Sequence, residues 1–202
     1  MAIIEVKSSH GITTVPIESR LLNGRNVFFS GSVREETALD AVKEIMYLIA
    51  EDPHAPINLF ITTNGGDVNQ GMLLYDVMVG LKDIELRTIC MGKAYSMGAL
   101  LLAAGQKGRR YILPNSEVMI HEPLLGNEIS GNSSTIKSIS DSLLATKQQT
   151  CEILVKHTGH TMEEIEEAIS YNHYFKAEEA IAFGLADHVI SFNDIVTGHF
   201  PK

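Results

Sequence analysis

The segment 84–105 constrains the fold of this chain more than any other. Residues 84–91 are apolar and rich in β-branched side chains, which is typical of a buried strand. An uncharged Ala/Leu run follows from residue 97 and ends at Gly105, which predicts a short internal helix with a glycine stop. Ser96 is therefore expected at the turn from strand to helix, where free N–H groups and the positive end of the helix dipole favour a developing oxyanion.

Small residues surround Ser96, so the backbone can turn tightly and a substrate can approach. The spacing Ala94-x-Ser96-x-Gly98 is a relaxed form of the G-x-S-x-G turn that presents nucleophilic serines. A serine at a helix N-terminus is more often a cap than a nucleophile. The hypothesis of a nucleophile therefore depends on other segments.

Length and composition restrict the class of protein. A chain of 202 residues is expected to form one domain, 1–202, with a sizeable core. The net charge of -9 and the lack of a basic run argue against a nucleic-acid partner. Two widely separated cysteines, Cys90 and Cys151, indicate reduced thiols, and neither a secretory leader nor a membrane-length apolar run is visible. We expect a cytoplasmic protein without a membrane partner.

The order of elements predicts an α/β fold. Strands alternate with helices from residue 57 to residue 105, which favours a sheet with parallel neighbours. The strands are expected at 26–30, 57–62, 84–91, 109–113 and 118–121, and the helices at 34–50, 67–81, 97–105, 135–157, 161–169 and 176–183.

Two regions differ from this pattern. Residues 1–18 contain Gly11 and Pro16 and are expected to form an extended arm or hairpin. Residues 126–134 are rich in Gly, Asn and Ser, and the long helix after them is polar over most of its surface. Such an element is expected to project from the domain and to be covered by another subunit.

A serine nucleophile needs a base, and His121 is the best candidate. It follows the apolar strand at 118–120, and active sites of open α/β sheets gather at strand ends. On its own, a histidine at a strand end is more often structural. Lys93 could form a Ser–Lys pair, but it lies three residues before Ser96 and is expected to point elsewhere. No metal motif is present, and no lysine follows Gly65-Gly66 as it would in a phosphate-binding loop; we therefore expect no metal and no cofactor.

Taken together, these motifs resemble the family of Clp protease proteolytic subunits, ClpP. The resemblance spans residues 17–190 and rests on several motifs in the same order: Gly65-Gly66-Asp67-Val68, Ala94-Tyr95-Ser96-Met97-Gly98, Leu102-Ala103-Ala104-Gly105, Leu113-Pro114-Asn115, Val118-Met119-Ile120-His121-Glu122-Pro123, Ala177-Glu178-Glu179-Ala180 and Gly184-Leu185-Ala186-Asp187. It implies a crotonase-like fold of repeated β-β-α units, with an axial loop at 1–18 and a projecting handle, a strand plus a long helix, at 124–158. It also implies serine endopeptidase activity on unfolded polypeptides, heptameric rings stacked as a tetradecamer, and an AAA+ unfoldase (Clp ATPase) as partner.

The resemblance also implies roles for individual residues. Ser96 matches the nucleophile and His121 the general base, while the amides of Gly66 and Met97 match the oxyanion hole. Substrate peptides are expected to lie along Leu124, Leu125 and Gly126. The ATPase is expected to dock in hydrophobic pockets, for which Phe60 and Tyr111 are candidate lining residues.

The sequence departs from the family pattern at the third catalytic position. An ungapped alignment places Asn172 where the family carries an aspartate, whereas a gap would bring His173 there. Asparagine can orient an imidazole but supplies no negative charge to the imidazolium. Ser170 and Tyr171 replace an acidic residue and an arginine that the family commonly uses between rings.

These departures leave two main functions open. One is an endopeptidase whose intrinsic activity is weakened; the alternative is a ring subunit that supports or gates an active ClpP paralogue. A crotonase-type acyl-CoA enzyme is disfavoured by the pairing of Ser96 with His121. An α/β-hydrolase is disfavoured because that fold carries serine, acid and histidine in another order.

Overall fold

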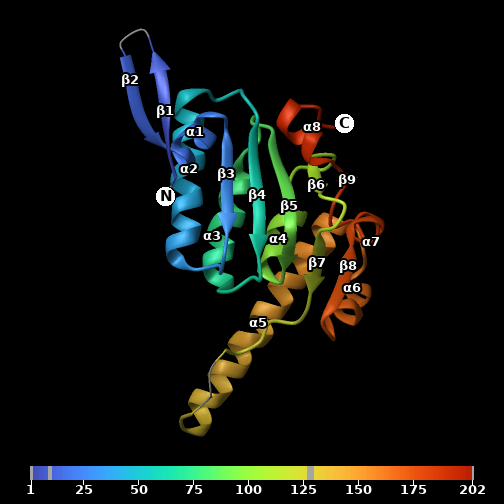
Figure 1. The fold of residues 1–202 in the computed structure, drawn as a ribbon. Coiled ribbons are helices and arrows are strands. Elements are labelled where there is room, and N and C mark those ends of the chain that lie inside the picture. The colour runs from blue at the N-terminus through green and yellow to red at the C-terminus, as the bar shows by residue number, and fades with distance from the viewer. Residues whose placement is uncertain (1, 9–10, 127–129, 202) are drawn as a thin grey trace.

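A mixed sheet forms the centre of the computed structural model, which describes residues 2–8, 11–126 and 130–201 (Figure 1). Within these ranges, five strands follow one another in the order β3-β4-β5-β6-β9, and all neighbours are parallel. A further strand, β7, pairs in parallel with the end of β5 and antiparallel with β8. The strands are β3 (Asn26–Ser30), β4 (Ile57–Thr63), β5 (Leu86–Tyr95), β6 (Arg110–Ile112), β7 (Glu117–Ile120), β8 (His173–Lys176) and β9 (His188–Val189).

Helices pack against this sheet, so the predicted α/β class is confirmed. Helix α3 packs against α2 and α4, and α4 packs in turn against β4, β5 and α5. The helices are α1 (Ile17–Asn23), α2 (Glu35–Glu51), α3 (Val68–Gly80), α4 (Met97–Ala103), α5 (Ser133–Thr158), α6 (Met162–Ile169), α7 (Ala177–Ala182) and α8 (Phe192–Thr197). Asp67 caps α3 by accepting a hydrogen bond from the backbone N–H of Gln70, as its spacing predicts.

The short helix α4 lies wholly inside the core. All seven of its residues are buried, which explains why the sequence carries no charge there. A buried leucine contributes roughly 1.5–3 kcal/mol to stability, and Leu101 and Leu102 are both fully covered. The position of Ser96, directly before this helix, is therefore fixed by the core.

The strand before Ser96 is longer than predicted, because β5 continues to Tyr95 instead of ending at Met91. Its pairing with β4 is shifted between Ile61 and Thr63, and Gly92 lies in the left-handed region with φ 88°. The N–H of Gly92 donates to the hydroxyl of Ser116 across 2.7 Å. The glycine thus accommodates an irregularity in the strand rather than a turn.

The N-terminal segment forms a two-stranded hairpin of β1 (Ile3–Ser8) and β2 (Gly11–Pro16) that extends beyond the sheet (Figure 1). A hairpin was one of the two predicted forms. Four elements lay outside the prediction: α1, β8, β9 and α8. Each is seven residues or shorter, so its local pattern is weak.

Helix α5 projects from the domain, as its polar surface predicts (Figure 1). Asn132 caps its start by accepting the N–H of Thr135, and Gly159 ends it with φ 88°. Buried side chains occur only in its C-terminal half, whereas Leu144 is 61% exposed. The preceding residues 124–126 and 130–132 form no strand, and the remainder of the predicted handle strand, residues 127–129, lies outside the described residues.

Candidate active site

Ser96 has a backbone conformation that is unusual for a residue other than glycine. Its φ is 55° and its ψ is -119°, a region that costs on the order of 1–3 kcal/mol. Although Ser96 is the N-cap residue of α4, its side chain makes no capping hydrogen bond. The hydroxyl is therefore available for another partner, and the simple capping role is wrong.

That partner is His121. The Nε2 atom of His121 lies 2.8 Å from the Oγ atom of Ser96, across a separation of 25 positions in sequence. Burial lowers the pKa of His121 below its usual value, because the charged imidazolium is poorly solvated there. The imidazole is therefore neutral at neutral pH and can accept the hydroxyl proton.

Gly65 packs directly against the Ser96 turn, and the adjacent Gly66 packs against Val33. A Cβ atom on Gly65 would lie 2.7 Å from the Cβ of Ser96, and one on Gly66 would lie 2.4 Å from the carbonyl oxygen of Val33. Both positions also have positive φ, 90° and 151°, so no other residue fits without strain. Among the hydrogen bonds of the described residues, none uses the backbone N–H of Gly66 or Met97. These two amides remain free to bind an oxyanion.

Asn172 lies beside His121 in the strand register but makes no recorded bond with it. Strands β7 and β8 pair up to Ile120 and His173, so His121 and Asn172 are the next positions on each side. Asn172 is exposed, and no hydrogen bond joins it to His121 among the described residues. Burial lowers the pKa of His121, and no carboxylate of the described residues opposes that shift.

His173, the alternative third member, packs elsewhere. Its ring stacks on Phe175 with a centroid distance of 4.1 Å and on Tyr171 with one of 5.1 Å. Its Nδ1 atom is buried without a hydrogen-bond partner among the described residues. Extended by one position, the β7–β8 register puts Asn172 opposite His121, whereas the ring of His173 packs on Phe175 and Tyr171.

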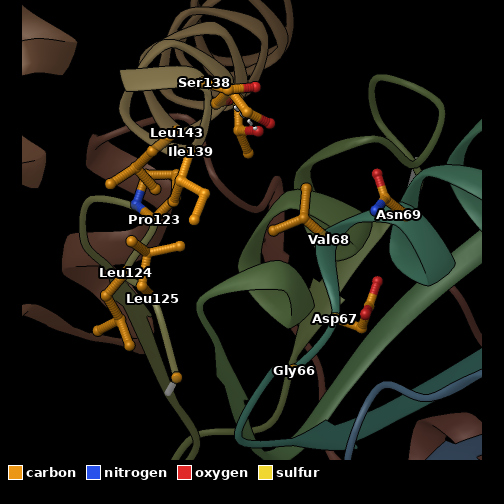
Figure 2. Close-up of a pocket in the computed structure, with 13 residues that line it drawn as sticks. Gly66, Asp67, Val68, Asn69, Pro123, Leu124, Leu125, Ser138, Ile139 and Leu143 are labelled. Carbon is orange, nitrogen blue, oxygen red and sulfur yellow. Dashed lines mark hydrogen bonds between the residues drawn. The ribbon is translucent and has the colours of Figure 1, made fainter. Parts of the chain in front are cut away.

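A groove of about 760 Å³ runs past Gly66, between the start of α3 and the projecting part of α5. Figure 2 shows Leu124 and Leu125 on one side of this groove and Val68 on the other. Gly126, Ile139 and Leu143 also line it. The three residues predicted to hold a peptide, 124–126, therefore share one groove with Gly66.

A second, much smaller cavity of about 20 Å³ lies against Ser96 and His121. It has room for little more than one water molecule. Its other lining residues are largely apolar and come from distant elements: Val68, Met97, Leu100, Ile120, Pro123, Thr150, Leu154 and Ile169. The residues that α5 and α6 contribute to this cavity could not be predicted from the sequence, because no local signal marks them.

A third pocket, of about 490 Å³, is lined in part by residues of β3, β4 and β5 and includes neither Ser96 nor His121. Phe60 lines it and stacks on Phe28, with ring centroids 4.8 Å apart. Tyr111 does not line it: this side chain is fully buried and donates its hydroxyl proton to the carbonyl oxygen of Pro201. The prediction of Tyr111 as a lining residue is wrong, because the C-terminal segment covers it.

Cys90 and Cys151 are both buried and unpaired, and burial raises the pKa of the Cys90 thiol to about 12. Over the described ranges, no cluster of three or more His, Cys, Asp or Glu side chains is arranged to hold a metal ion. None of the helices in these ranges is long and apolar enough to cross a membrane.

A strained serine at a buried helix, bonded to a histidine at a strand end, is the arrangement of a serine hydrolase. A comparison with known protein families agrees with the class of serine hydrolases and identifies one family within it. The family described as Clp protease matches residues 9–193, which is most of the chain. The chain belongs to the Clp protease family. It is a ClpP-like protease, and this family consists generally of serine peptidases that work with Clp ATPases in stacked rings.

Proposed function

We propose that this chain is a serine endopeptidase subunit in which Ser96 is the nucleophile and His121 the general base. The observation that carries the proposal is the 2.8 Å contact between Ser96 Oγ and His121 Nε2. The hydroxyl is bound to a neutral imidazole and is not used to cap the helix. Both conditions are needed for a serine to lose its proton during attack.

The reaction then follows from the positions of these groups. Ser96 Oγ attacks the peptide carbonyl carbon while His121 Nε2 takes the hydroxyl proton. The N–H groups of Gly66 and Met97 donate to the carbonyl oxygen as it becomes negative; one such donor typically contributes about 10²- to 10³-fold in rate. His121 returns the proton to the leaving amine, and a water molecule, activated by the same imidazole, releases the acyl group.

The peptide is proposed to occupy the groove beside residues 124–126. An extended segment there can use backbone hydrogen bonds, which favour any unfolded chain over a particular sequence. A Clp ATPase is proposed to dock in the pocket that contains Phe28 and Phe60 and to deliver such chains from there. The exposed part of α5 is proposed to join two heptameric rings into a tetradecamer.

An alternative role is supported by Asn172. Within the described part of the chain, no carboxylate contributes to the pKa of His121, and asparagine cannot stabilise the imidazolium that forms during attack. Aspartate-to-asparagine substitution in a well-studied serine protease lowers kcat by about 10⁴-fold. The chain would then serve as a weakly active ring subunit that supports or gates an active ClpP paralogue.

Peptidase assays distinguish these roles. The purified protein is assayed with a short fluorogenic peptide, alone and after mixing with a second ClpP from the same cell. Turnover by the protein alone, abolished in Ser96→Ala, is the expected result. A rate that appears only in the mixture, and that Ser96→Ala leaves unchanged, would replace the proposal with the supporting role.

A further inference from the structure

Three strands of the sheet meet at the carboxylate of Glu117. The hydroxyl of Tyr95, on β5, donates to its Oε1 atom across 2.6 Å. The ammonium group of Lys176, on β8, donates to its Oε2 atom across 2.5 Å. Glu117 itself begins β7, so this one side chain connects β5, β7 and β8.

Each of these strands also has one residue of the proposed site directly beyond one of its ends. Tyr95 directly precedes Ser96, and β7 ends one residue before His121. Strand β8 begins one residue after Asn172 and pairs with β7 from Glu117–Lys176 to Ile120–His173. The Glu117 cluster therefore lies at one end of a four-pair ladder, and His121 and Asn172 lie just beyond the other end.

The cluster is charged and intact at neutral pH. Lys176 and, to a smaller extent, Tyr95 lower the pKa of the Glu117 carboxyl group. The hydrogen bond between Tyr95 and Glu117 raises the pKa of Tyr95 to about 12, so the hydroxyl of Tyr95 keeps its proton. The ring of Tyr95 also contacts that of Tyr174 edge-on, with centroids 5.7 Å apart.

Two contacts bear on the register of the short strand β8: the buried side chain of Phe175 and the ion pair between Lys176 and Glu117. Strand β8 is four residues long, and among the described strands it pairs with β7 alone. A slip of one residue would move Asn172 away from His121. Lys176 is exposed, so its ion pair alone is weak, whereas the second bond from Tyr95 fixes the carboxylate that receives it.

We propose that Glu117 is a positioning residue of this active site: its carboxylate fixes β8, which follows Asn172, and β5, which precedes Ser96, relative to His121. This inference rests on the proposed peptidase function. It assigns Glu117 no contact with substrate. Its effect is on the rate of the chemical step and not on peptide binding.

The test compares Glu117→Gln, Tyr95→Phe and Lys176→Met with the unmodified protein, in both the Asn172 and the Asn172→Asp backgrounds. Glu117→Gln should lower kcat for a fluorogenic peptide roughly 5- to 10-fold, with KM within about twofold, because small misplacements reduce rate more than binding. Lys176→Arg should restore most of the rate that Lys176→Met loses. The double variant Glu117→Gln/Lys176→Met should be no slower than Glu117→Gln, since both changes break one contact.

Glu85→Gln is the matched control. Glu85 also accepts hydrogen bonds from two side chains, those of Arg87 and Arg109, but it lies before the opposite end of β5. Its loss should affect stability without changing kcat. Hydrogen exchange of the amides at 173–176 supplies a readout independent of turnover, and Glu117→Gln should accelerate it at least about tenfold.

The proposed peptidase function and the positioning role of Glu117 are refuted by different results. Residual turnover in Ser96→Ala would refute the proposed function whatever Glu117 does. A normal kcat and normal exchange at 173–176 in Glu117→Gln, with Ser96→Ala inactive, would overturn the positioning role alone. Should Glu117→Gln fail to fold, an unchanged kcat in both Tyr95→Phe and Lys176→Met would overturn it equally.

Discussion

The backbone N–H of Ser96 donates to the carbonyl oxygen of Met119 across 2.7 Å. This bond connects the turn that carries the serine to the strand that ends just before His121. The distance between the two side chains proposed to be catalytic is therefore set by the sheet and not by flexible loops. Such a pair is already placed for reaction before any substrate binds.

Asn172→Asp should raise the peptidase rate. A carboxylate beside His121 would stabilise the imidazolium that forms during attack. A full gain of about 10⁴-fold in kcat would lower the activation barrier by roughly 5 kcal/mol, at about 1.36 kcal/mol per tenfold in rate. We expect a gain in kcat of about tenfold or more with KM little changed, and less than full restoration because Ser170 and Tyr171 also differ from the family pattern.

A short fluorogenic peptide avoids any limit from ATPase docking, and sedimentation checks that the oligomer is unchanged. If kcat of Asn172→Asp is unchanged or lower while the oligomer is intact, residue 172 is not the third catalytic residue. His173→Ala is the companion variant. It should leave kcat unaffected, because its ring packs on Phe175.

The pH dependence of the reaction should follow the pKa of His121. Only the neutral imidazole can accept the proton of Ser96, so the rate falls as pH drops through that pKa. Burial lowers it, so the acid limb should lie below the usual value of about 6.5. Asn172→Asp stabilises the charged form and should move the limb to higher pH. A limb that stays in place in this variant would show that position 172 does not act on His121.

Ring pairing should depend on the exposed part of α5. Leu144 is 61% exposed in the described part of the chain. Leu144→Glu should therefore yield single rings or smaller species by sedimentation, because a charge would be buried between subunits. Gln149→Glu adds the same charge at an exposed position on a different face of α5 and serves as the control. Intact double rings in Leu144→Glu, with normal circular dichroism, would contradict the assembly role.

Docking of a Clp ATPase should require the aromatic pocket at β3 and β4. Phe28 is 44% exposed and stacks on Phe60, so Phe28→Ser removes pocket surface with little loss of core. We expect ATPase binding at least roughly tenfold weaker, as for a buried aromatic anchor at an interface. Tyr47 is equally exposed, at 44%, but lies on α2 outside the pocket, so Tyr47→Ser is the matched control. Equal binding by Phe28→Ser and the native protein would refute this docking site.

Much of this site could be predicted from the sequence because its parts are local. Ser96 follows an apolar strand and precedes an uncharged helix, and His121 ends another apolar strand. Both patterns are short enough to recognise without knowledge of distant contacts. Gly66 was indicated by the family resemblance, and its φ of 151° fits a position that requires glycine.

The missed features depend on contacts between distant segments. Strand β8 exists because it pairs with β7, and its four residues carry no clear alternation. The free hydroxyl of Ser96 could not be distinguished from a helix cap until its backbone angles were known. Tyr111 was misassigned because its cover, Pro201, lies 90 positions away.

Labelling of the serine with a fluorophosphonate probe tests the central claim most directly, because only a serine activated by a base reacts rapidly. The probe should modify the native protein at Ser96, which peptide mass spectrometry would identify. Ser96→Ala should take up no label, and His121→Ala should react at least about 100-fold more slowly. Labelling of the native protein at another residue, or equal labelling of His121→Ala, would contradict the Ser96–His121 mechanism.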